Sequence, residues 1–148
     1  MKILVIGSNG QIGSSLIKEL KDYKVEYLNK EQLDCRNLEA LKNYFINKSY
    51  DYVINAVAYT KVDQAEVDAD KAKLLNATYP NELSKILKKM NCALIHYSTD
   101  YVFDGTKTPD YFEQSTPNPL NIYGKTKLLG DLSILKQNLN GYILRVSW

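Results

Sequence analysis

Short apolar segments rich in Val and Ile alternate along this chain with longer segments in which apolar residues recur every three or four positions. Short apolar runs of this kind are typical of parallel strands that are buried on both faces. The longer segments have the period of amphipathic helices. The alternation therefore predicts βαβ units. We expect five strands, at residues 2–6, 24–28, 52–57, 93–97 and 142–146.

The helical period is clearest in residues 11–20 and 38–46. A third helical stretch covers residues 63–90 and contains Pro80, so we expect either two helices or a kink just before the proline. Glycine and three prolines mark residues 103–120 as a long surface loop. The pattern as a whole predicts an α/β fold of the Rossmann-like kind, a doubly wound parallel sheet with helices on both faces.

Length and composition narrow the class of protein. A chain of 148 residues suits one domain, and 45% hydrophobic with 24% charged residues excludes a disordered chain. No apolar run approaches the roughly 20 residues of a membrane span and no signal peptide is visible, so we expect a cytoplasmic protein that does not bind a membrane. The net charge of +2 gives no reason to expect nucleic acid. Cys35 and Cys92 are too few and too far apart for a metal site, which favours two reduced thiols.

A glycine motif follows the first predicted strand and opens the first predicted helix. Gly7 and Gly10 allow a tight turn and a close approach of the backbone to a pyrophosphate, and Gly13 allows the helix to pack closely on the strand. The helix N-terminus adds free N–H groups and a partial positive charge. The alternative, a glycine-rich turn without a ligand, does not account for this placement between strand and helix. We therefore predict a dinucleotide site.

The end of the second strand indicates which dinucleotide is bound. A carboxylate at this place holds the ribose hydroxyls and repels a 2′-phosphate. Here the strand is followed by the neutral Asn29 and by Lys30, which favours NADPH, with NADH as the alternative. Lys30 is equally well explained as an ordinary loop lysine. Asp34 and Cys35 lie a few residues later, beside the adenine or in a turn that leads into the next helix.

Tyr123 and Lys127 are spaced four residues apart on a predicted helix. A phenol is a slow proton donor at neutral pH, and an ammonium about 4 Å away would lower its pKa by roughly three units at an effective dielectric constant near 20. The pair therefore predicts a proton donor beside the cofactor. Since the chain has 12 tyrosines, the spacing also recurs by chance, at Tyr44 and Lys48. That second copy lacks polar neighbours and is interpreted as a solvated helix face.

Thr99 completes a catalytic set with Tyr123 and Lys127. It lies in the polar run 98–100 at the end of the fourth strand, where open α/β sheets bind ligands. Its hydroxyl could polarise a substrate carbonyl, while the cofactor supplies the hydride. The competing interpretation of Thr99 is a cap of the strand end. The single histidine, His96, lies within the apolar strand and is interpreted as a packed residue.

Three segments carry a resemblance to a known family. They are Ser98-Thr-Asp-Tyr-Val-Phe-Asp-Gly105, Asn121-Ile-Tyr-Gly-Lys-Thr-Lys-Leu-Leu-Gly130 and Asn55-Ala-Val-Ala-Tyr-Thr-Lys-Val-Asp63. Together they resemble the dTDP-4-dehydrorhamnose reductases, which are short-chain dehydrogenase/reductases of the extended type. The resemblance spans the whole chain and implies reduction of the nucleotide sugar dTDP-4-dehydro-L-rhamnose to dTDP-L-rhamnose.

The resemblance also implies roles for single residues. Tyr123 would be the proton donor and Lys127 its partner, and both would border the cofactor, as would Tyr97. Thr99 and Asp100 would meet the sugar at its ketone, and Trp148 would face the sugar nucleotide. The remaining cofactor contacts would be Gly10, Gln11 and Ile12 at the pyrophosphate, and Ala58, Tyr59 and Thr60 after the third strand. Some members of the family form dimers bridged by magnesium, which implies a homodimer here.

Departures from the family are few, and three functions remain open. Asp131 and Val146 stand where the family usually has Glu and Thr, and neither is assigned a catalytic role. Family members are nearly twice as long, so residues 1–148 are expected to form the cofactor-binding Rossmann domain without the C-terminal substrate-binding part. The reductase is favoured. The alternatives are a noncatalytic dinucleotide-binding module that regulates another enzyme, and a sugar-nucleotide epimerase or dehydratase with a tightly held cofactor.

Overall fold

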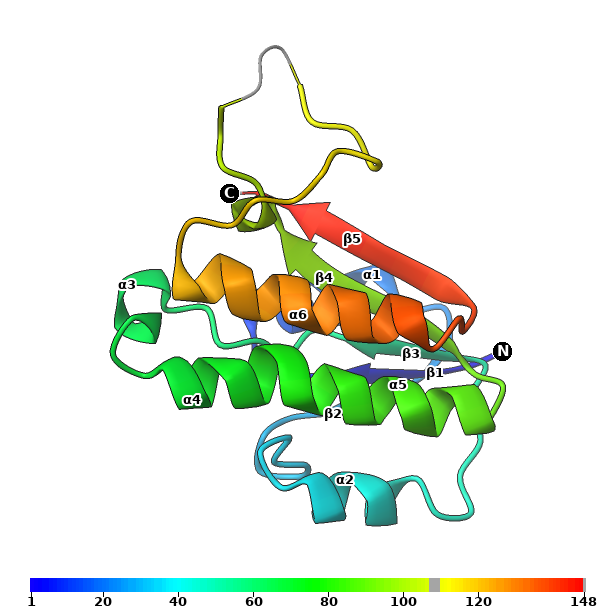
Figure 1. The fold of residues 1–148 in the computed structure, drawn as a ribbon. Helices are drawn as coiled ribbons and strands as arrows, with labels where there is room; N and C mark the ends of the chain where they lie inside the picture. The colour runs from blue at the N-terminus through cyan, green and yellow to red at the C-terminus, as the bar shows by residue number, and fades with distance from the viewer. Residues whose placement is uncertain (107–109, 148) are drawn as a thin grey trace.

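The computed structural model describes residues 1–106 and 110–147. These residues form a five-stranded sheet in the order β2-β1-β3-β4-β5 (Figure 1), and every neighbouring pair is parallel. The predicted doubly wound α/β fold is confirmed. The strands are β1 (Lys2–Ile6), β2 (Lys24–Leu28), β3 (Tyr52–Asn55), β4 (Ala93–Thr99) and β5 (Gly141–Val146).

β5 begins one residue earlier than predicted, at Gly141, and two strands end at a different residue than predicted. β3 ends two residues early because the Asn55 side chain accepts a hydrogen bond from the N–H of Val57, which turns the backbone out of the sheet. β4 continues two residues further because β5 pairs with it as far as Thr99, opposite Val146. Both differences lie at the carboxyl edge of the sheet, where side chains of the following turns decide how far pairing continues.

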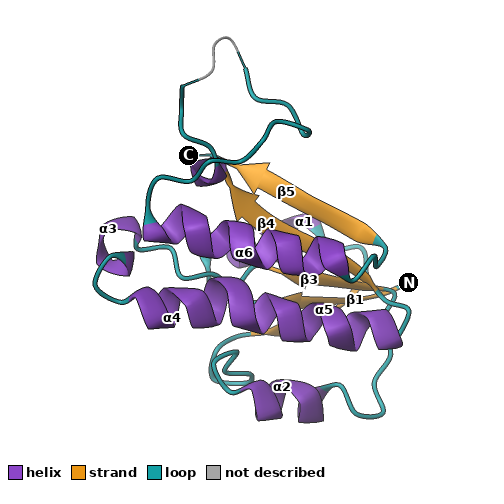
Figure 2. Ribbon diagram, viewed as in Figure 1, coloured by secondary structure: helices purple, strands orange, loops and turns teal. Residues whose placement is uncertain are grey.

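Helices cover both faces of the sheet, as Figure 2 shows, with α1 on one face and α2, α5 and α6 on the other. The α-helices are α1 (Gln11–Glu19), α2 (Leu38–Tyr44), α3 (Val62–Ala65), α4 (Ala69–Lys73), α5 (Tyr79–Lys89) and α6 (Ile122–Lys136). A π-helical turn, η1 (Leu74–Thr78), joins α4 to α5, and a 3₁₀ turn, η2 (Asp100–Val102), follows β4.

The core has two layers because neighbouring residues of a strand point to opposite faces. Leu4 and Ile6 of β1 belong to the larger layer, which packs against α2, α5 and α6. Ile3 and Val5 belong to the smaller layer, which packs against α1. The continuous apolar run of β1 is therefore explained by burial on both faces.

The expected interruption before Pro80 takes an unexpected form. Residues 69–89 remain helical throughout, and the hydrogen-bonding pattern changes from α through π and back to α. Pro80 lies in the first turn of α5, where its missing N–H is least costly. The π turn thus accommodates the proline without separating two helices.

The π turn also brings Asn76 against α6. A Cβ atom at Gly130 would overlap the Asn76 carbonyl oxygen, so this contact requires glycine. The Asn76 side chain is fully buried and accepts from the N–H of Tyr59 at 2.8 Å, while its amide donates to the Tyr59 carbonyl and to the Thr126 hydroxyl. One buried asparagine therefore fixes the loop after β3 relative to α6.

Interpretation of Tyr44 and Lys48 as a solvated helix face is wrong. α2 ends at Tyr44, so the two residues do not share a helix, and both side chains are half-buried. The Tyr44 hydroxyl donates to the Glu26 carboxylate at 2.6 Å, and the Lys48 ammonium lies 3.7 Å from the centre of the Tyr44 ring. Packing of the ring and its bond to the carboxylate hold the pair in a structural cluster beside β2.

We expect Gly130→Ala to lower the free energy of unfolding by about 1–3 kcal/mol, because overlap with a backbone oxygen cannot be relieved by a rotamer change. The intrinsic helix preference for alanine works in the opposite direction and amounts to about 1 kcal/mol. Urea unfolding followed by circular dichroism measures the difference. Lys125→Ala, at an exposed position of the same helix, is the control and should be nearly neutral. Equal stability of Gly130→Ala and the wild type would contradict the packing described.

Candidate active site at the carboxyl edge of the sheet

Because all five strands run parallel, their carboxyl ends lie along one edge (Figure 1), where open α/β sheets bind ligands. The loops after β1, β3 and β4 and the first turns of α6 meet there. The predicted site residues that the structure describes lie near or after the carboxyl ends of β1 to β4, or on α6. Trp148 lies outside the described residues.

The loop after β1 is held in a defined shape. The N–H groups of Gly7 and Ser8 donate to the Leu28 carbonyl of β2 at 2.8 and 3.0 Å, and Gly7 has a φ of +93°. A Cβ atom at Gly13 would overlap the Gly7 carbonyl oxygen. Glycine is therefore required at both ends of the loop, at the first for its backbone conformation and at the second for close packing.

The N-terminus of α1 fits an anionic group. Its N-cap, Gly10, provides no side-chain acceptor, and no acidic residue stands in the first turn. The first intrahelical acceptor is the Gly10 carbonyl, which receives the N–H of Ser14, so the N–H groups of Gln11, Ile12 and Gly13 have no partner in the helix. Exposed donors and the helix dipole together suit a dinucleotide pyrophosphate.

In the turn after β2, Asn29 bonds to the backbone and Lys30 is exposed. The Asn29 side chain accepts from the N–H groups of Glu31 and Gln32 at 3.0 Å each, so it shapes its own turn. Lys30 is exposed. Asn29 is therefore uncharged at this edge, but its side chain bonds within the turn and is not directed at a ligand. Lys30 is the cation next to Asn29 in sequence.

Asp34 and Cys35 are both engaged by the protein. The Arg36 guanidinium binds both oxygens of the Asp34 carboxylate and lowers the pKa of that carboxyl to about 2. The Cys35 side chain is buried in the larger core layer, where burial raises the pKa of its thiol to about 11. A ligand beside this turn would therefore meet the Asp34–Arg36 pair and the backbone of Cys35, but not its thiol.

The loop after β3, with Ala58, Tyr59 and Thr60, runs from the end of β3 toward α3. The Tyr59 hydroxyl donates to Asp68 at 3.1 Å, and its ring packs in a small cluster that includes Tyr123. The backbone of this loop is held by Asn76, as described above. Its position is therefore fixed by α6 and the π turn.

At the end of β4, Thr99 has the role of a cap. Its hydroxyl accepts from the N–H of Tyr101 at 3.2 Å and donates to the Asp100 carboxylate at 3.1 Å. The same hydroxyl lies close enough to Tyr123 to lower the pKa of its phenol. Capping and proximity to the phenol are compatible, because the cap uses the oxygen as an acceptor.

Helix α6 aligns three polar residues on one buried face. Asn121 caps the helix by accepting from the N–H of Gly124, and Tyr123, Lys127 and Asp131 follow at intervals of four. Their side chains are 8%, 1% and 0% exposed. The spacing that identified Tyr123 and Lys127 therefore extends one turn further, to a carboxylate.

The expected lowering of the Tyr123 pKa by Lys127 is wrong. Burial raises the pKa of the phenol, as do the nearby acidic groups, and the Thr99 hydroxyl opposes this only in part. The Lys127 ammonium instead donates to the Tyr97 carbonyl at 2.6 Å and lies 3.4 Å from His96 Nε2. Its own pKa is lowered to about 8 by burial. The geometry gives a phenol that holds its proton at neutral pH.

A group of buried polar side chains lies around Lys127, and most of it was not assigned a role from the sequence. His96 is packed as expected, and its Nδ1 lies 2.9 Å from the Asn55 amide. Asp131 accepts from the Ser98 hydroxyl at 2.7 Å. Two sequence features indicate this group: polar residues alternate along β4, and polar residues recur at positions i, i+4 and i+8 of α6. The buried members are Asn55, His96, Ser98 and Asp131, and the half-buried Arg145 lies beside Asp131.

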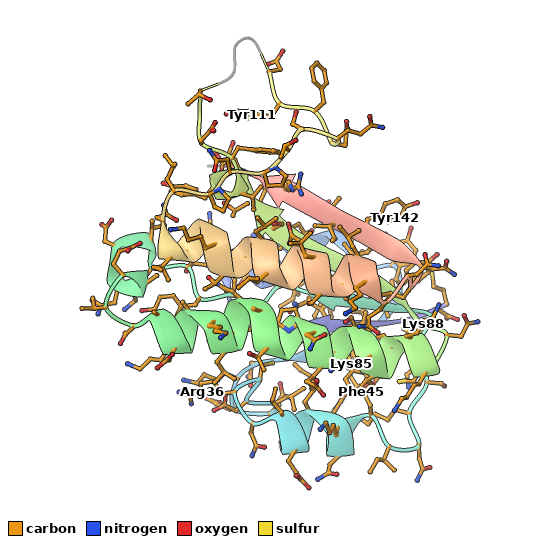
Figure 3. All side chains as sticks on the ribbon, viewed as in Figure 1. Arg36, Phe45, Lys85, Lys88, Tyr111 and Tyr142 are labelled. Atoms are coloured by element: carbon orange, nitrogen blue, oxygen red, sulfur yellow. The ribbon has the colours of Figure 1, made fainter. Side chains whose placement is uncertain are left out.

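A pocket of about 440 Å³ lies under the loop that follows β4. Tyr101 forms one wall and contacts the Tyr123 ring edge to face, with centroids 5.6 Å apart. Asp104 holds the loop by accepting from Tyr111 and Asn118, and Tyr111 lies within this loop (Figure 3), with its ring stacked on Phe103. The lining residues are Asp100, Tyr101, Phe103, Asp104, Gly105, Tyr111, Leu120 and Asn121.

Metal-binding clusters and membrane-spanning helices are both absent from the parts of the chain that the structure covers. Residues 1–106 and 110–147 contain no group of three or more His, Cys, Asp or Glu side chains able to hold a metal ion, so the magnesium implied by the family resemblance has no support there. No helix in these ranges is long and apolar enough to cross a bilayer.

Comparison with known proteins gives a consistent result. The family model described as "RmlD substrate binding domain" matches residues 1–148. The chain is 40% identical to the dTDP-4-dehydrorhamnose reductase of Burkholderia thailandensis, over all of this chain and 50% of that protein. It is 38% identical to the enzyme of the same name from Aggregatibacter actinomycetemcomitans, over 99% of this chain and 51% of that protein. The chain thus spans about half the length of the curated relatives it matches.

Solved structures agree with the sequence relatives. A dTDP-4-dehydrorhamnose reductase from Bacillus anthracis, in complex with NADP, superposes with a TM-score of 0.94 at 33% identity, over 99% of this chain and 53% of that one. An orthologue from Clostridium acetobutylicum gives 0.94 at 38% identity, over 100% and 54%. A UDP-Glc/GlcNAc 4-epimerase from Campylobacter jejuni gives 0.88 at 20% identity, over 97% and 52%, which shows the fold alone.

Burial of His96 predicts how stability depends on pH. Its folded-state pKa is lowered well below 6.5, by burial and then by the Lys127 charge, so the unfolded chain binds a proton here more readily than the native state does. Stability should therefore fall as pH drops through 6.5, by about 1 kcal/mol between pH 7 and 5.5. Urea unfolding at both pH values measures this. In His96→Gln the difference should vanish, and an unchanged difference in that variant would assign it to another group.

Proposed function

Because the chain belongs to the family described as the RmlD substrate binding domain, we propose that it forms the cofactor-binding and proton-donating part of an NADPH-dependent reductase of 4-keto sugar nucleotides. The reaction proposed is the conversion of dTDP-4-dehydro-L-rhamnose to dTDP-L-rhamnose, which is what the names of the relatives indicate. The enzyme would act in the cytoplasm, and a homodimer is consistent with the family resemblance.

One observation carries the proposal. Tyr123 lies beside the Thr99 hydroxyl, and its ring contacts Tyr101, which lines the pocket under the loop after β4, at the same edge of the sheet as the glycine loop. A ketone bound next to Tyr101 would then be near a proton donor and a hydroxyl. The dinucleotide would extend from the N-terminus of α1 along the strand ends. It would pass residues 58–60 and Tyr97 and end beside Tyr123 and Lys127.

A bound nicotinamide would supply the hydride to the carbonyl carbon. The Tyr123 phenol would give its proton to the carbonyl oxygen, and its raised pKa means that the phenol carries this proton at neutral pH. Thr99 would donate a hydrogen bond to the same oxygen once its hydroxyl turns from Asp100. The Lys127 ammonium donates to the Tyr97 carbonyl and would have to turn toward Tyr123 to stabilise the phenolate left behind, since a positive charge favours the charged form of the phenol.

Other contacts follow from the same arrangement. Asp100 is exposed at the wall of the pocket and is proposed to bind the sugar, together with Trp148. NADPH is favoured over NADH because Asn29 is neutral and Lys30 is exposed beside it. The NADP complex of the Bacillus anthracis relative agrees with a nicotinamide dinucleotide as cofactor.

Tyr123→Phe should lower the rate of NADPH oxidation with dTDP-4-dehydro-L-rhamnose by about 10²-fold or more, since the proton donor is lost. Cofactor binding, measured by fluorescence titration of NADPH, should remain near that of the wild type. Tyr44→Phe is the matched control. It should retain turnover and lose about 1 kcal/mol of stability, because its hydroxyl bonds only within the cluster beside β2.

The assay uses residues 1–148 and a form extended past Trp148, because the relatives are about twice as long. Absence of turnover in the extended form, with cofactor bound, would refute the reductase. Loss of activity in Tyr44→Phe rather than in Tyr123→Phe would refute the assignment of the proton donor.

Lys30→Ala tests the choice of cofactor. If Lys30 attracts the 2′-phosphate, the dissociation constant for NADPH should rise about tenfold, corresponding to about 1.4 kcal/mol, while that for NADH stays unchanged. Isothermal titration calorimetry with both dinucleotides measures this. Lys18→Ala, in the last turn of α1, removes the same charge elsewhere and is the control. Equal weakening of both dinucleotides in Lys30→Ala would contradict a phosphate contact.

A further inference from the structure

The buried polar side chains near Tyr123 are linked by contacts that determine which of their atoms carry protons. Asn55 Oδ1 accepts from the N–H of Val57 and from the Tyr79 hydroxyl, both at 3.1 Å. This fixes the orientation of the amide, so Asn55 Nδ2 is the donor to His96 Nδ1 at 2.9 Å. His96 Nδ1 must therefore carry a lone pair.

Since His96 is neutral, its single ring proton lies on Nε2. Two groups lie near Nε2, the Lys127 amine at 3.4 Å and Asp131 Oδ1 at 3.9 Å. A charged ammonium has no lone pair and cannot accept this proton. Asp131 Oδ1 is buried and has no hydrogen-bond partner, and at 3.9 Å its contact with His96 Nε2 is electrostatic rather than a formed hydrogen bond. Of the two groups, the carboxylate is the one with a lone pair to offer the Nε2–H while Lys127 is charged.

Two groups contact the other carboxylate oxygen of Asp131, Oδ2, and orient the side chain. The Ser98 hydroxyl donates to Oδ2 at 2.7 Å, and Arg145 Nε lies 3.7 Å from it. Both favour the ionised carboxyl, against burial, which raises its pKa. The Arg145 guanidinium in turn lies 5.1 Å from the Phe103 ring, at the start of the loop over the pocket.

We propose that Asp131 is a positioning residue for the proton donor: its buried carboxylate, oriented by Ser98 and Arg145, faces the Nε2–H of His96 at 3.9 Å and provides the counter-charge that keeps Lys127 an ammonium. This rests on the proposed function in that the charged Lys127 serves Tyr123. Asp131 itself touches neither phenol nor pocket.

The charges around Lys127 leave Asp131 as the controlling group. Lys127 faces neutral His96 and the Tyr97 carbonyl of β4, and Arg145 of β5 lies behind the Asp131 carboxylate. On α6, Tyr123 and Asp131 lie one turn to either side of Lys127. Burial lowers the pKa of Lys127 and the Asp131 charge opposes this, which leaves the pKa at about 8. Without the carboxylate, the pKa of Lys127 would fall further, and the neutral amine could accept the Nε2–H instead. The Lys–His contact is thus compatible with both charge states, and Asp131 selects between them.

The test uses the single histidine as a reporter. In ¹⁵N-histidine-labelled protein, the imidazole shifts are followed from pH 6 to 9.5 without any need for turnover. Wild type should show the Nε2–H tautomer throughout and an inflection near pH 8 as Lys127 loses its proton. Lys127→Met should remove the inflection. Asp131→Asn should move it down by about one pH unit or more.

Two control variants should keep the inflection near pH 8. Asp131→Glu retains the carboxylate, and Asp70→Asn removes an exposed carboxylate on α4. In a turnover assay, the activity of Asp131→Asn should be lost at a correspondingly lower pH than that of the wild type, with the KM for NADPH little changed.

An inflection at the same pH in Asp131→Asn and wild type would overturn the proposal. If Asp131→Asn does not fold, the wild type decides, because a proton on Nδ1, or no inflection that depends on Lys127, would also overturn it. A reductase that fails to turn over would refute the proposed function while leaving the histidine titration as a separate result.

Discussion

Parallel pairing of β4 with both β3 and β5 is the constraint on which the site depends. It places β4 inside the sheet, so that alternate residues must be buried on each face. His96 and Ser98 face α6, whereas Ile95 and Tyr97 face α1. Two polar residues on a buried face require polar partners, and α6 supplies them at the spacing of one helical turn. The polar contacts at the carboxyl edge of the sheet therefore depend on how the residues of β4 align with those of α6.

The parts of the fold that sequence could predict are those governed by local rules. Apolar periodicity gave the strands β1 and β2 with their observed bounds, and the glycine loop was recognised because its conformation needs glycine at Gly7 and Gly13. The errors had two sources. The Asn55 side chain bonds to the N–H two residues later and shortened β3 locally. Glu26, from β2, drew Tyr44 into a half-buried cluster, and that distant partner is not visible from spacing along the chain.

The candidate site shows the same division. Tyr123 and Thr99 were identified from position, but the electrostatics around them were not, because the direction of the Lys127 amine depends on the Tyr97 carbonyl and on His96. Helical spacing places a side chain on a face without saying which atom it meets. Burial then reverses the expected shift of the Tyr123 pKa. Polar residues in a core acquire their roles from tertiary contacts, which a single sequence does not contain.

The two hydrogen bonds from the Gly7 and Ser8 amides to the Leu28 carbonyl have a thermodynamic consequence. They fix the glycine loop to the edge of β2 through the protein's own backbone, so the loop does not have to be ordered by a ligand. The conformational entropy of those residues is lost during folding rather than during association. A phosphate that binds there meets donors already in position, and its binding enthalpy is not offset by freezing the loop. Selectivity can then reside in the more exposed turn after β2, while the loop provides affinity common to any dinucleotide.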